Sequence, residues 1–184
     1  MYKRQQLKRL VEYLECLPLT IVSIDNLEAD DIMSHICNLV LKDSKFTIMS
    51  ADKYFYQLVD DRVQLYSPTK KIVYDRELIK KEFGVYPQNV LTCRVVDGDK
   101  SDDIPGVRGI GVKTLIKEFP LLVEDREFNT KDLIDMAKSR NTRISKMIQD
   151  NELIIKRNYL LMQLGDPDIK NQTCLLYTSP SPRD

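Results

Sequence analysis

Apolar residues first follow helical spacing and then alternate between strand and helix patterns. An amphipathic helix over residues 1–16, ended by Pro18, is predicted by four residues at i, i+3, i+4 and i+7 spacing: Leu7, Leu10, Val11 and Leu14. A second helix is predicted over 26–42. Short β-branched or apolar runs predict strands at 20–24, 46–49, 63–67 and 71–74. Strands that alternate with helices indicate an α/β sheet.

From residue 75 onward the pattern is almost wholly helical. Asp75 is suited to cap a helix over 76–83, with Gly84 just past its end, and Pro87 opens a helix that reaches about residue 96. We therefore divide the chain into an α/β part, 1–86, and a helical part, 87–172. The last segment, 173–184, contains Thr-Ser-Pro-Ser-Pro-Arg-Asp and no apolar period. It resembles a translated sequencing adapter and is interpreted as a non-native tail, the alternative being a natural disordered tail.

Composition narrows the candidate chemistry. Of 184 residues, 42% are hydrophobic, which is enough for a core, and 28 basic residues balance 28 acidic ones, so net charge indicates no partner. No apolar run is long enough for a membrane span. The cysteines show no C-x-x-C pairing, which disfavours a zinc site or a disulfide framework and predicts a reducing, cytoplasmic compartment. Because His35 is the one histidine, carboxylates are the best candidates for catalysis.

Three acidic clusters each follow an apolar segment directly. They are Glu28-Ala29-Asp30-Asp31, then Asp52 at the end of the predicted strand 46–49, and then the loop 97–103 with Asp99 and Asp102. Helix capping is the plain explanation for acidic residues at such positions. Three carboxylates within four residues, however, repel one another unless a cation neutralises them.

Carboxylates from several segments suit hard divalent cations such as Mg²⁺. Two such ions about 4 Å apart can activate a water and stabilise the leaving oxygen in phosphodiester cleavage. A calcium loop does not fit 97–108, because Asp102 stands where that loop needs glycine and Arg108 where it needs glutamate.

A glycine-rich hairpin with basic residues, 104–119, follows the third cluster. Gly106, Gly109 and Gly111 allow tight turns and a close approach to a ligand, and the helix expected from Gly111 to Phe119 begins with unpaired amides that suit a phosphate. Positive charge is added by Arg108, Lys113 and Lys117. Binding of this kind contacts the nucleic-acid backbone, so it should be independent of base sequence and sensitive to salt. No strand precedes the hairpin as in a Rossmann motif, and Val112 replaces the lysine of a Walker loop.

These motifs together resemble the 5′ nuclease superfamily, which includes phage ribonuclease H, flap endonucleases and the 5′→3′ exonuclease domain of bacterial DNA polymerase I. The resemblance rests on the order and spacing of three segments: Glu28-Ala29-Asp30-Asp31, Ser50-Ala51-Asp52, and Gly98-Asp99-x-x-Asp102 before Ile104-Pro105-Gly106-Val107. It covers about residues 1–165. It implies a PIN-like (Rossmann-like) sheet flanked by helices and a helical region with a helix-hairpin-helix.

The resemblance also implies roles for individual residues. Glu28, Asp30 and Asp31 would serve a first Mg²⁺ or Mn²⁺ ion, and Asp52, Asp99 and Asp102 a second. The segment from Gly106 to Lys113 would hold duplex DNA, where the family often uses a bound K⁺. Lys3 and Arg4 would lie at the trailing end of the helical arch through which a single-stranded 5′ end passes.

The sequence departs from the family pattern in two places. Tyr54 stands where the family has the second aspartate of Asp-x-Asp, so we expect the second ion to bind weakly. The family's first strand, with its metal-binding aspartate, has no counterpart, so the chain is expected to be an N-terminally truncated fragment with little activity by itself.

The predicted function of the complete protein is a metal-dependent 5′ nuclease that removes RNA primers or flaps during DNA replication or repair. Its expected partners are a DNA or RNA/DNA duplex with a 5′ end or flap and replication proteins, with no membrane, and the chain is expected to be a monomer in a bacterial or phage-infected cell. The first alternative is a non-catalytic, structure-specific DNA-binding module. The second is an α/β domain whose acidic turns only cap helices.

Overall fold

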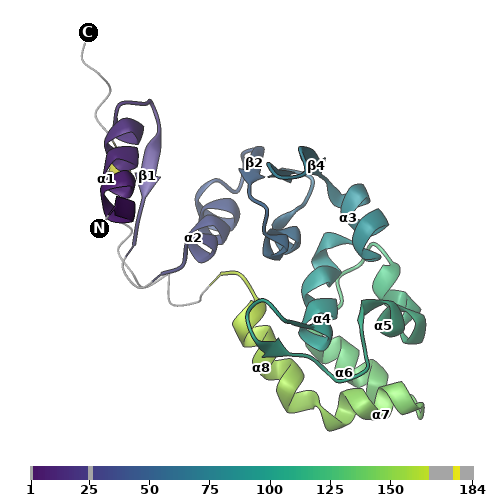
Figure 1. Ribbon diagram of the computed structural model, residues 1–184. Helices are drawn as coiled ribbons and strands as arrows, with labels where there is room; N and C mark the ends of the chain where they lie inside the picture. Colours follow the sequence, from purple (N-terminus) through teal and green to yellow (C-terminus); the bar gives the residue numbers. More distant parts are fainter. Residues whose placement is uncertain (1, 25–26, 166–175, 179–184) are drawn as a thin grey trace.

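The computed structural model describes residues 2–24, 27–165 and 176–178 (Figure 1). At the N-terminus, α1 (Tyr2–Glu15) is followed by β1 (Thr20–Val22) and by α2 (Ala29–His35), which continues as the π-helical turn η1 (Ile36–Val40). Figure 1 shows α1 and β1 at one end of the molecule, with α2 between them and the three-stranded sheet. The helix predicted over 26–42 therefore begins later, because Glu28 still has extended backbone angles.

The central sheet contains three strands in the order β2-β3-β4. β2 (Phe46–Met49) runs parallel to β3 (Val63–Ser67), and β3 pairs antiparallel with β4 (Ile72–Tyr74). Between β2 and β3 lies the 3₁₀ helix η2 (Lys53–Leu58). Ile48 and Leu65 pair across β2 and β3 and are both buried, so one face of the sheet joins the core.

The first strand does not join this sheet. β1 instead pairs antiparallel with β7 (Leu176–Thr178), a strand in the segment where no regular element is predicted. Tyr177 and Thr178 are residue types enriched in strands, which favours a strand at this position. The interpretation of residues 173–184 as a non-native tail stays a prediction, and the structure describes residues 176–178 of this segment.

The second half is helical and closely follows the predicted pattern. Asp75 accepts a hydrogen bond from the backbone N–H of Leu78 at 2.8 Å, and Gly84 adopts the left-handed conformation (φ 103°) at the end of the helix. The two-residue strands β5 and β6 form a small hairpin in the acidic loop. The elements are α3 (Arg76–Phe83), α4 (Pro87–Asp97), β5 (Gly98–Asp99), β6 (Ile104–Pro105), α5 (Val112–Glu118), η3 (Pro120–Val123), α6 (Thr130–Lys138), α7 (Arg143–Asp150) and α8 (Glu152–Met162).

One hydrophobic core extends through both halves and has α4 at its centre. Val90, Cys93 and Val96 of α4 are buried, and α4 packs against α8, α5 and η2. The buried side chain of Asn89 donates to the carbonyl of Arg126 at 2.7 Å and accepts from the N–H of Phe128 at 2.8 Å, so its polar atoms are satisfied within the core. This packing fixes the acidic loop after α4 relative to the sheet.

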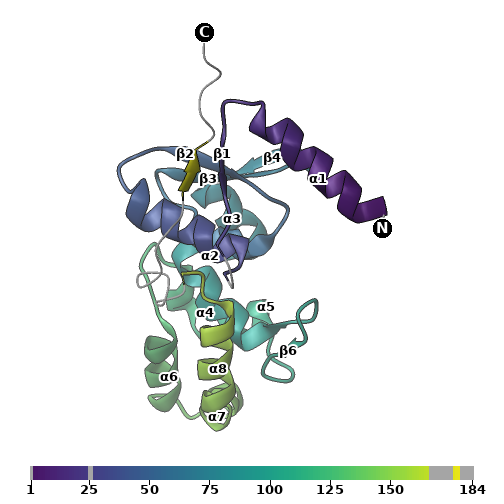
Figure 2. The same ribbon diagram turned by 90° about the vertical axis from the view of Figure 1, so that its left-hand side faces the viewer.

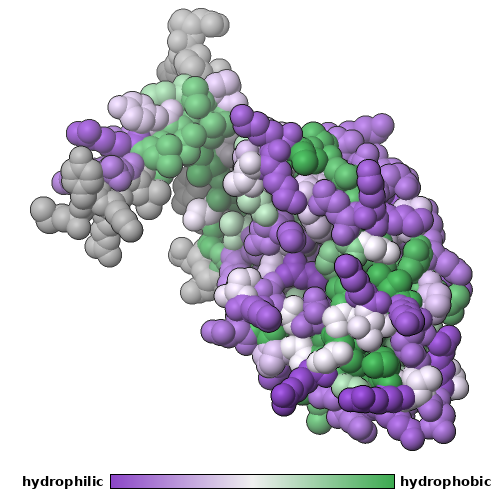
Figure 3. Space-filling view, turned by 45° about the vertical axis from the view of Figure 1, so that its right-hand side comes forward, coloured by the Kyte–Doolittle hydropathy of each residue, from purple (hydrophilic) through white to green (hydrophobic). Residues whose placement is uncertain are grey.

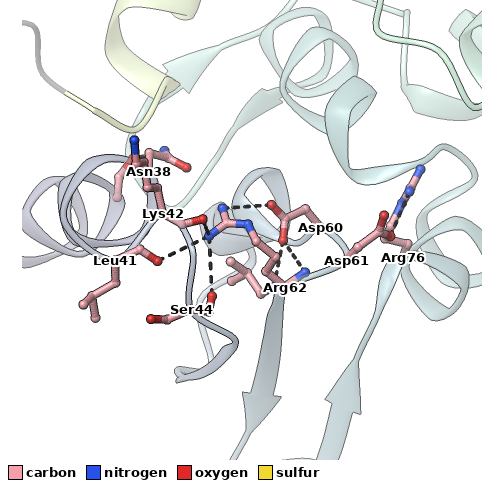
Figure 4. A network of polar contacts seen from close by, with 10 residues as sticks. Asn38, Leu41, Lys42, Ser44, Asp60, Asp61, Arg62 and Arg76 are labelled. Carbon is pink, nitrogen blue, oxygen red and sulfur yellow. Dashed lines mark hydrogen bonds and ion pairs between the residues drawn. The ribbon is translucent and has the colours of Figure 1, made fainter.

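Arg62 joins the end of the α2–η1 helix to the start of β3. Its guanidinium donates to the carbonyl oxygens of Leu41 and Lys42 and forms an ion pair with Asp60 at 3.2 Å (Figure 4). These carbonyls belong to the helix end, where backbone acceptors lack partners within the helix. Arg62 thereby caps that end and positions α2 beside the sheet.

The face drawn in Figure 3 is mainly hydrophilic, with an apolar cluster at the end of the molecule formed by α1 and β1. Leu10, Tyr13 and Leu17 are exposed there. Within the described ranges, no helix combines the length and the apolar character needed to cross a membrane.

Candidate active site

The first acidic cluster lies at the start of α2. Glu28 is the residue before the first helical turn, yet its side chain makes no capping hydrogen bond, so capping does not explain it. Asp30 and Asp31 lie in the first turn, where their charge complements the helix dipole. Asp31 also accepts a hydrogen bond from the backbone N–H of Gly165 at 3.1 Å, which links α2 to the segment after α8.

Asp52 follows β2 and caps η2. Its carboxylate accepts a hydrogen bond from the backbone N–H of Tyr54 at 2.8 Å, while its own N–H donates to the hydroxyl of Ser50 at 3.1 Å. Capping is therefore one demonstrated role of Asp52. The side chain remains exposed at the end of the strand, where ligands bind in open α/β sheets.

The third cluster lies in the turn between β5 and β6. Asp99 forms an ion pair with Arg94 and accepts hydrogen bonds from the amide and hydroxyl of Ser101. Burial works to raise the pKa of Asp99, but these hydrogen bonds and the Arg94 charge lower it on balance. Asp102 is exposed, and its neighbour Asp103 adopts a left-handed backbone conformation (φ 54°).

Five of the six predicted carboxylates line one cavity of about 830 Å³. The lining residues are Glu28, Asp30, Asp31, Asp52, Tyr54, Asp102, Ile104 and Leu160 to Leu164. Asp99 is not among these lining residues, and its carboxylate forms an ion pair with Arg94. The structure thus brings together segments separated by more than seventy residues in the sequence.

The donor set of the cavity fits a hard divalent cation, because every candidate ligand is a carboxylate oxygen. Within the described ranges, however, no three histidine, cysteine, aspartate or glutamate side chains form a group compact enough to hold a metal ion. The carboxylates surround the cavity without forming a ready-made coordination shell. Binding would therefore require them to move toward the ion.

Tyr54 forms part of the cavity wall between the second and third clusters. Burial raises the pKa of its phenol, and a hydrogen bond with Asp102 and the negative charge of Asp99 act in the same direction. The phenol therefore stays protonated and neutral near pH 7, which makes it a poor ligand for Mg²⁺. A neutral phenol at this position is consistent with the prediction that the second ion binds weakly.

Two residues that contact the cavity lining were missed by the sequence reasoning. The guanidinium of Arg94 lies over the ring of Tyr54, 4.1 Å from its centroid, and the side-chain amide of Gln57 donates a hydrogen bond to the carbonyl of Met162 at the end of α8. Neither belongs to an acidic or glycine-rich motif. Their positions depend on contacts between η2, α4 and α8, for which the sequence carries no local signal.

The predicted hairpin is present and is held by backbone contacts. The N–H of Val107 donates to the carbonyl of Val96 at 2.7 Å, and a Cβ on Gly106 would lie 2.1 Å from the carbonyl oxygen of Asp97. Gly109 has a positive φ of 83°, which favours glycine. Gly111 precedes α5 directly and also lies close to Asp97.

Basic side chains surround this hairpin, while its apolar ones anchor it. Val107 and Ile110 are buried, and Arg108, Lys113 and Lys117 are exposed. Lys3 and Arg4 belong to α1, but their side chains lie outside the described part of the structure. The hairpin thus presents three of the five predicted basic contacts to solvent.

Asn158 of α8 fixes the hairpin to the helical core. Its fully buried amide donates to the carbonyls of Val95 and Pro105, both at 2.9 Å. One side chain therefore joins the end of α4, the strand β6 and α8. The strand that follows the third acidic cluster and leads into the glycine turn is thereby held against α4 and α8.

Sequence comparisons find similarity to 5′-3′ exonucleases. Residues 3–84 match the family described as 5′-3′ exonuclease, N-terminal resolvase-like domain. The 5′-3′ exonuclease of Buchnera aphidicola (subsp. Schizaphis graminum) is 35% identical over 118 residues, which cover 62% of this chain and 41% of the relative. The thermostable DNA polymerase I of Thermus thermophilus is 34% identical over 114 residues, 61% of this chain and 14% of that protein. The chain thus spans about two-fifths of the exonuclease and a small part of the polymerase.

Solved structures of the bacteriophage T5 enzyme show the same fold. T5 5′-exonuclease with bound divalent metal ions (zinc) superimposes with a TM-score of 0.63 at 26% identity, over 76% of this chain and 51% of that one. The T5 flap endonuclease in a pseudo-enzyme-product complex with DNA and metal ions gives the same TM-score and identity, over 76% and 50%. The predicted fold class and the predicted resemblance are therefore confirmed: residues 3–84 match the 5′-3′ exonuclease N-terminal resolvase-like domain, and the described fold is similar to that of the T5 5′-exonuclease.

Proposed function

We propose that this chain supplies metal-binding and DNA-binding parts of a 5′→3′ exonuclease or flap endonuclease. The observation that carries the proposal is the single cavity in which Glu28, Asp30, Asp31, Asp52 and Asp102 meet. A basic hairpin follows the third acidic cluster directly and is tied to the same core by Asn158. The T5 relatives with bound divalent metal ions and with DNA support the same conclusion.

Two groups of carboxylates would hold Mg²⁺ or Mn²⁺. Glu28, Asp30 and Asp31 form the group on α2, and Asp52 with Asp102 forms the opposite group, with Asp99 beside it. When bound, such ions supply an activated water and stabilise the leaving oxygen of a phosphodiester. The chain's own residues position the ligands: Gly165 holds Asp31 through its N–H, and the turn at η2 holds Asp52.

The hairpin would bind the sugar-phosphate backbone of the duplex. Arg108, Lys113 and Lys117 are exposed cations around a turn whose glycines permit a close approach, and K⁺ is proposed to bind at the same turn. Lys3 and Arg4 are proposed to contact the single-stranded 5′ end. Such contacts do not distinguish bases, so structure and not sequence would select the substrate.

The proposed substrate is a DNA or RNA/DNA duplex with a 5′ end or flap, and the proposed process is primer or flap removal in replication or repair. We place this activity in the cytoplasm of a bacterial or phage-infected cell, with the protein acting as a monomer beside replication proteins. The free thiols of Cys16, Cys37 and Cys93 are compatible with a reducing compartment.

Metal binding tests the proposed role of the cavity. Calorimetric titration with Mn²⁺ should show binding to the chain, and we expect Asp30→Asn or Asp102→Asn to weaken it at least tenfold by removing a charged ligand. Asp103→Asn is the matched control, because Asp103 is adjacent to Asp102 but outside the cavity lining, and asparagine tolerates its left-handed backbone. Equal Mn²⁺ affinity in all three variants would contradict the proposal.

DNA binding and cleavage test the proposed activity. We expect fluorescence anisotropy to show tighter binding of a 5′-flap duplex than of a blunt duplex of equal length. Cleavage of the labelled flap, measured with Mg²⁺ on this chain and on a version extended by the upstream coding sequence, should stop with a chelator and with Asp102→Asn. Flap cleavage that persists in Asp102→Asn would show that the cavity is not the active site.

A non-catalytic DNA-binding module is the second candidate. It is favoured by Tyr54 in the cavity wall and by the lack of a compact three-ligand group within the described residues. Tyr54→Asp distinguishes the two candidates, because it restores an acidic ligand without touching the hairpin. A large gain in Mg²⁺-dependent cleavage supports a nuclease limited by Tyr54, whereas unchanged flap binding without cleavage in either protein supports the binding module.

A further inference from the structure

Arg94 occupies a mostly buried position, where the desolvation of an arginine is unfavourable unless the guanidinium pairs with a negative charge. It lies in the last turn of α4, directly before the acidic loop, and its side chain is only 14% exposed. Transfer of a guanidinium out of water is unfavourable unless opposite charge and hydrogen bonds compensate for it. The contacts of the Arg94 side chain therefore indicate its role.

Those contacts are an ion pair and an aromatic ring. The guanidinium pairs with the carboxylate of Asp99, whose side chain is 11% exposed, and lies 4.1 Å from the centre of the Tyr54 ring. Its other terminal nitrogen, Nη1, is buried and has no hydrogen-bond partner in the described part of the chain. Arg94 is thus held by charge and by the ring face, with an incomplete set of hydrogen bonds.

Several acidic groups face this one cation. Asp99 pairs with it directly. Burial raises the pKa of Asp97 on balance, and the positive charge of Arg94 opposes that rise. Tyr54, whose ring the guanidinium covers, has its pKa raised by burial and by the neighbouring Asp102. Lys100 also acts on Asp97, but from the exposed side of the loop. Like charges packed into one short loop repel one another, so a counter-charge is needed whenever no metal ion is present.

We propose that Arg94 is the built-in counter-cation of the acidic loop and that it competes with a divalent ion for Asp99. The inference rests on the proposed function, since it concerns the metal sites of the same cavity. The ion pair engages the carboxylate of Asp99, which is not among the residues that line the cavity, and the guanidinium repels any divalent cation that approaches it. Arg94 consequently makes the group formed by Asp52, Asp99 and Asp102 the weaker of the two ion sites and keeps the loop folded while that site is empty.

Removal of this charge gives a specific expectation. In Arg94→Gln, Asp99 loses its competitor, and we expect the weaker Mn²⁺ site to bind roughly tenfold more tightly, because an opposing charge at this range is worth about one power of ten or more. The metal-free variant should be less stable than wild type, and Mn²⁺ should raise its melting temperature by a larger increment. Arg94→Lys keeps the charge, so its Mn²⁺ affinity should stay within about twofold of wild type.

Arg140→Gln is the matched control. Arg140 also pairs with one carboxylate, Glu118 at 3.9 Å, and lies over an aromatic ring, that of Phe119 at 5.3 Å. None of the three residues Arg140, Glu118 and Phe119 lines the acidic cavity. A purely structural effect of losing a stacked, paired arginine should appear in both glutamine variants, whereas tighter Mn²⁺ binding should appear only in Arg94→Gln.

Two measurements test the proposal. Calorimetric titration gives the Mn²⁺ affinity of each variant, and circular dichroism monitors its thermal unfolding with and without Mn²⁺. Tighter binding in Arg94→Gln alone supports the proposal, and equal or weaker binding overturns it while leaving the proposed function intact, provided that Asp102→Asn weakens Mn²⁺ binding. Absence of Mn²⁺ binding, or binding insensitive to both Asp30→Asn and Asp102→Asn, overturns the proposed function and this proposal together. If Arg94→Gln is unfolded without metal, refolding by Mn²⁺ supports the proposal, and failure to refold overturns it.

Discussion

The side-chain amide of Gln57 donates a hydrogen bond to the carbonyl oxygen of Met162 at 3.1 Å, joining η2 to the end of α8. The same amide donates to the carbonyl of Tyr54 at 3.1 Å, and its oxygen accepts from the N–H of Leu164 at 3.0 Å. Tyr54, Met162 and Leu164 all line the acidic cavity. One glutamine therefore holds two walls of the candidate active site together.

Gln57→Ala should destabilise the protein and loosen this wall. It leaves the carbonyl of Met162 and the N–H of Leu164 without partners, and we expect a loss of about 1–3 kcal/mol in the free energy of unfolding, measured by urea denaturation. Gln64→Ala, on the exposed face of β3, should change stability by less than about 0.5 kcal/mol. If both variants are equally stable, the bridge to α8 contributes nothing.

Local signals in the sequence predicted most individual elements. The strand at 46–49 and the helix 76–83, with its Asp75 cap and Gly84 end, occur as predicted because each depends on residues within a few positions. The acidic clusters and the glycine hairpin were also found, since they are contiguous motifs. Their meeting in one cavity followed from the position of each cluster at the end of an apolar segment.

Long-range pairing was not predictable in the same way. The partner of β1 is β7, more than 150 positions away, and no property of Thr20 to Val22 selects it over the edge of β2. Asp99 was predicted to serve the same ion as Asp102, and its ion pair with Arg94 was not anticipated. Ion pairs of this kind depend on which charged side chains the fold brings together, and the spacing of residues in a motif does not indicate this.

Gly106 and Gly109 should respond differently to alanine. A Cβ at Gly106 would lie 2.1 Å from the carbonyl oxygen of Asp97, so the turn must shift, and we expect Gly106→Ala to cost about 3 kcal/mol or more. Gly109 has open space around it and only its φ of 83° opposes a side chain, at about 1–2 kcal/mol. Chemical denaturation of both variants measures the difference, and the reverse order would show that the turn is not packed as described.

Asn158→Leu should uncouple the hairpin from the core. The substitution leaves the carbonyls of Val95 and Pro105 without their buried donor, which predicts a loss of about 2–4 kcal/mol in unfolding free energy. Flap-DNA affinity should fall as well, because the hairpin is no longer held in place. Asn38→Leu, which removes one part-buried hydrogen bond to Ser34 on α2, is the control and should leave DNA affinity unchanged. An Asn158→Leu protein with normal stability and affinity would contradict the role of Asn158.

Phosphate contacts by the hairpin predict a measurable dependence of DNA affinity on salt. Each cation that contacts a phosphate releases about one counterion, so Arg108→Gln should weaken binding for all base sequences alike and reduce the slope of log Kd against log salt by about 1. Lys113→Gln should act similarly, since Lys113 is exposed in the first turn of α5 beside the same hairpin. Lys131→Gln in α6, which lies away from β6 and α5 in Figure 2, should leave the slope unchanged. Anisotropy titrations at several salt concentrations provide these slopes, and a slope that falls in Lys131→Gln but not in Arg108→Gln would place the DNA on the opposite face of the protein.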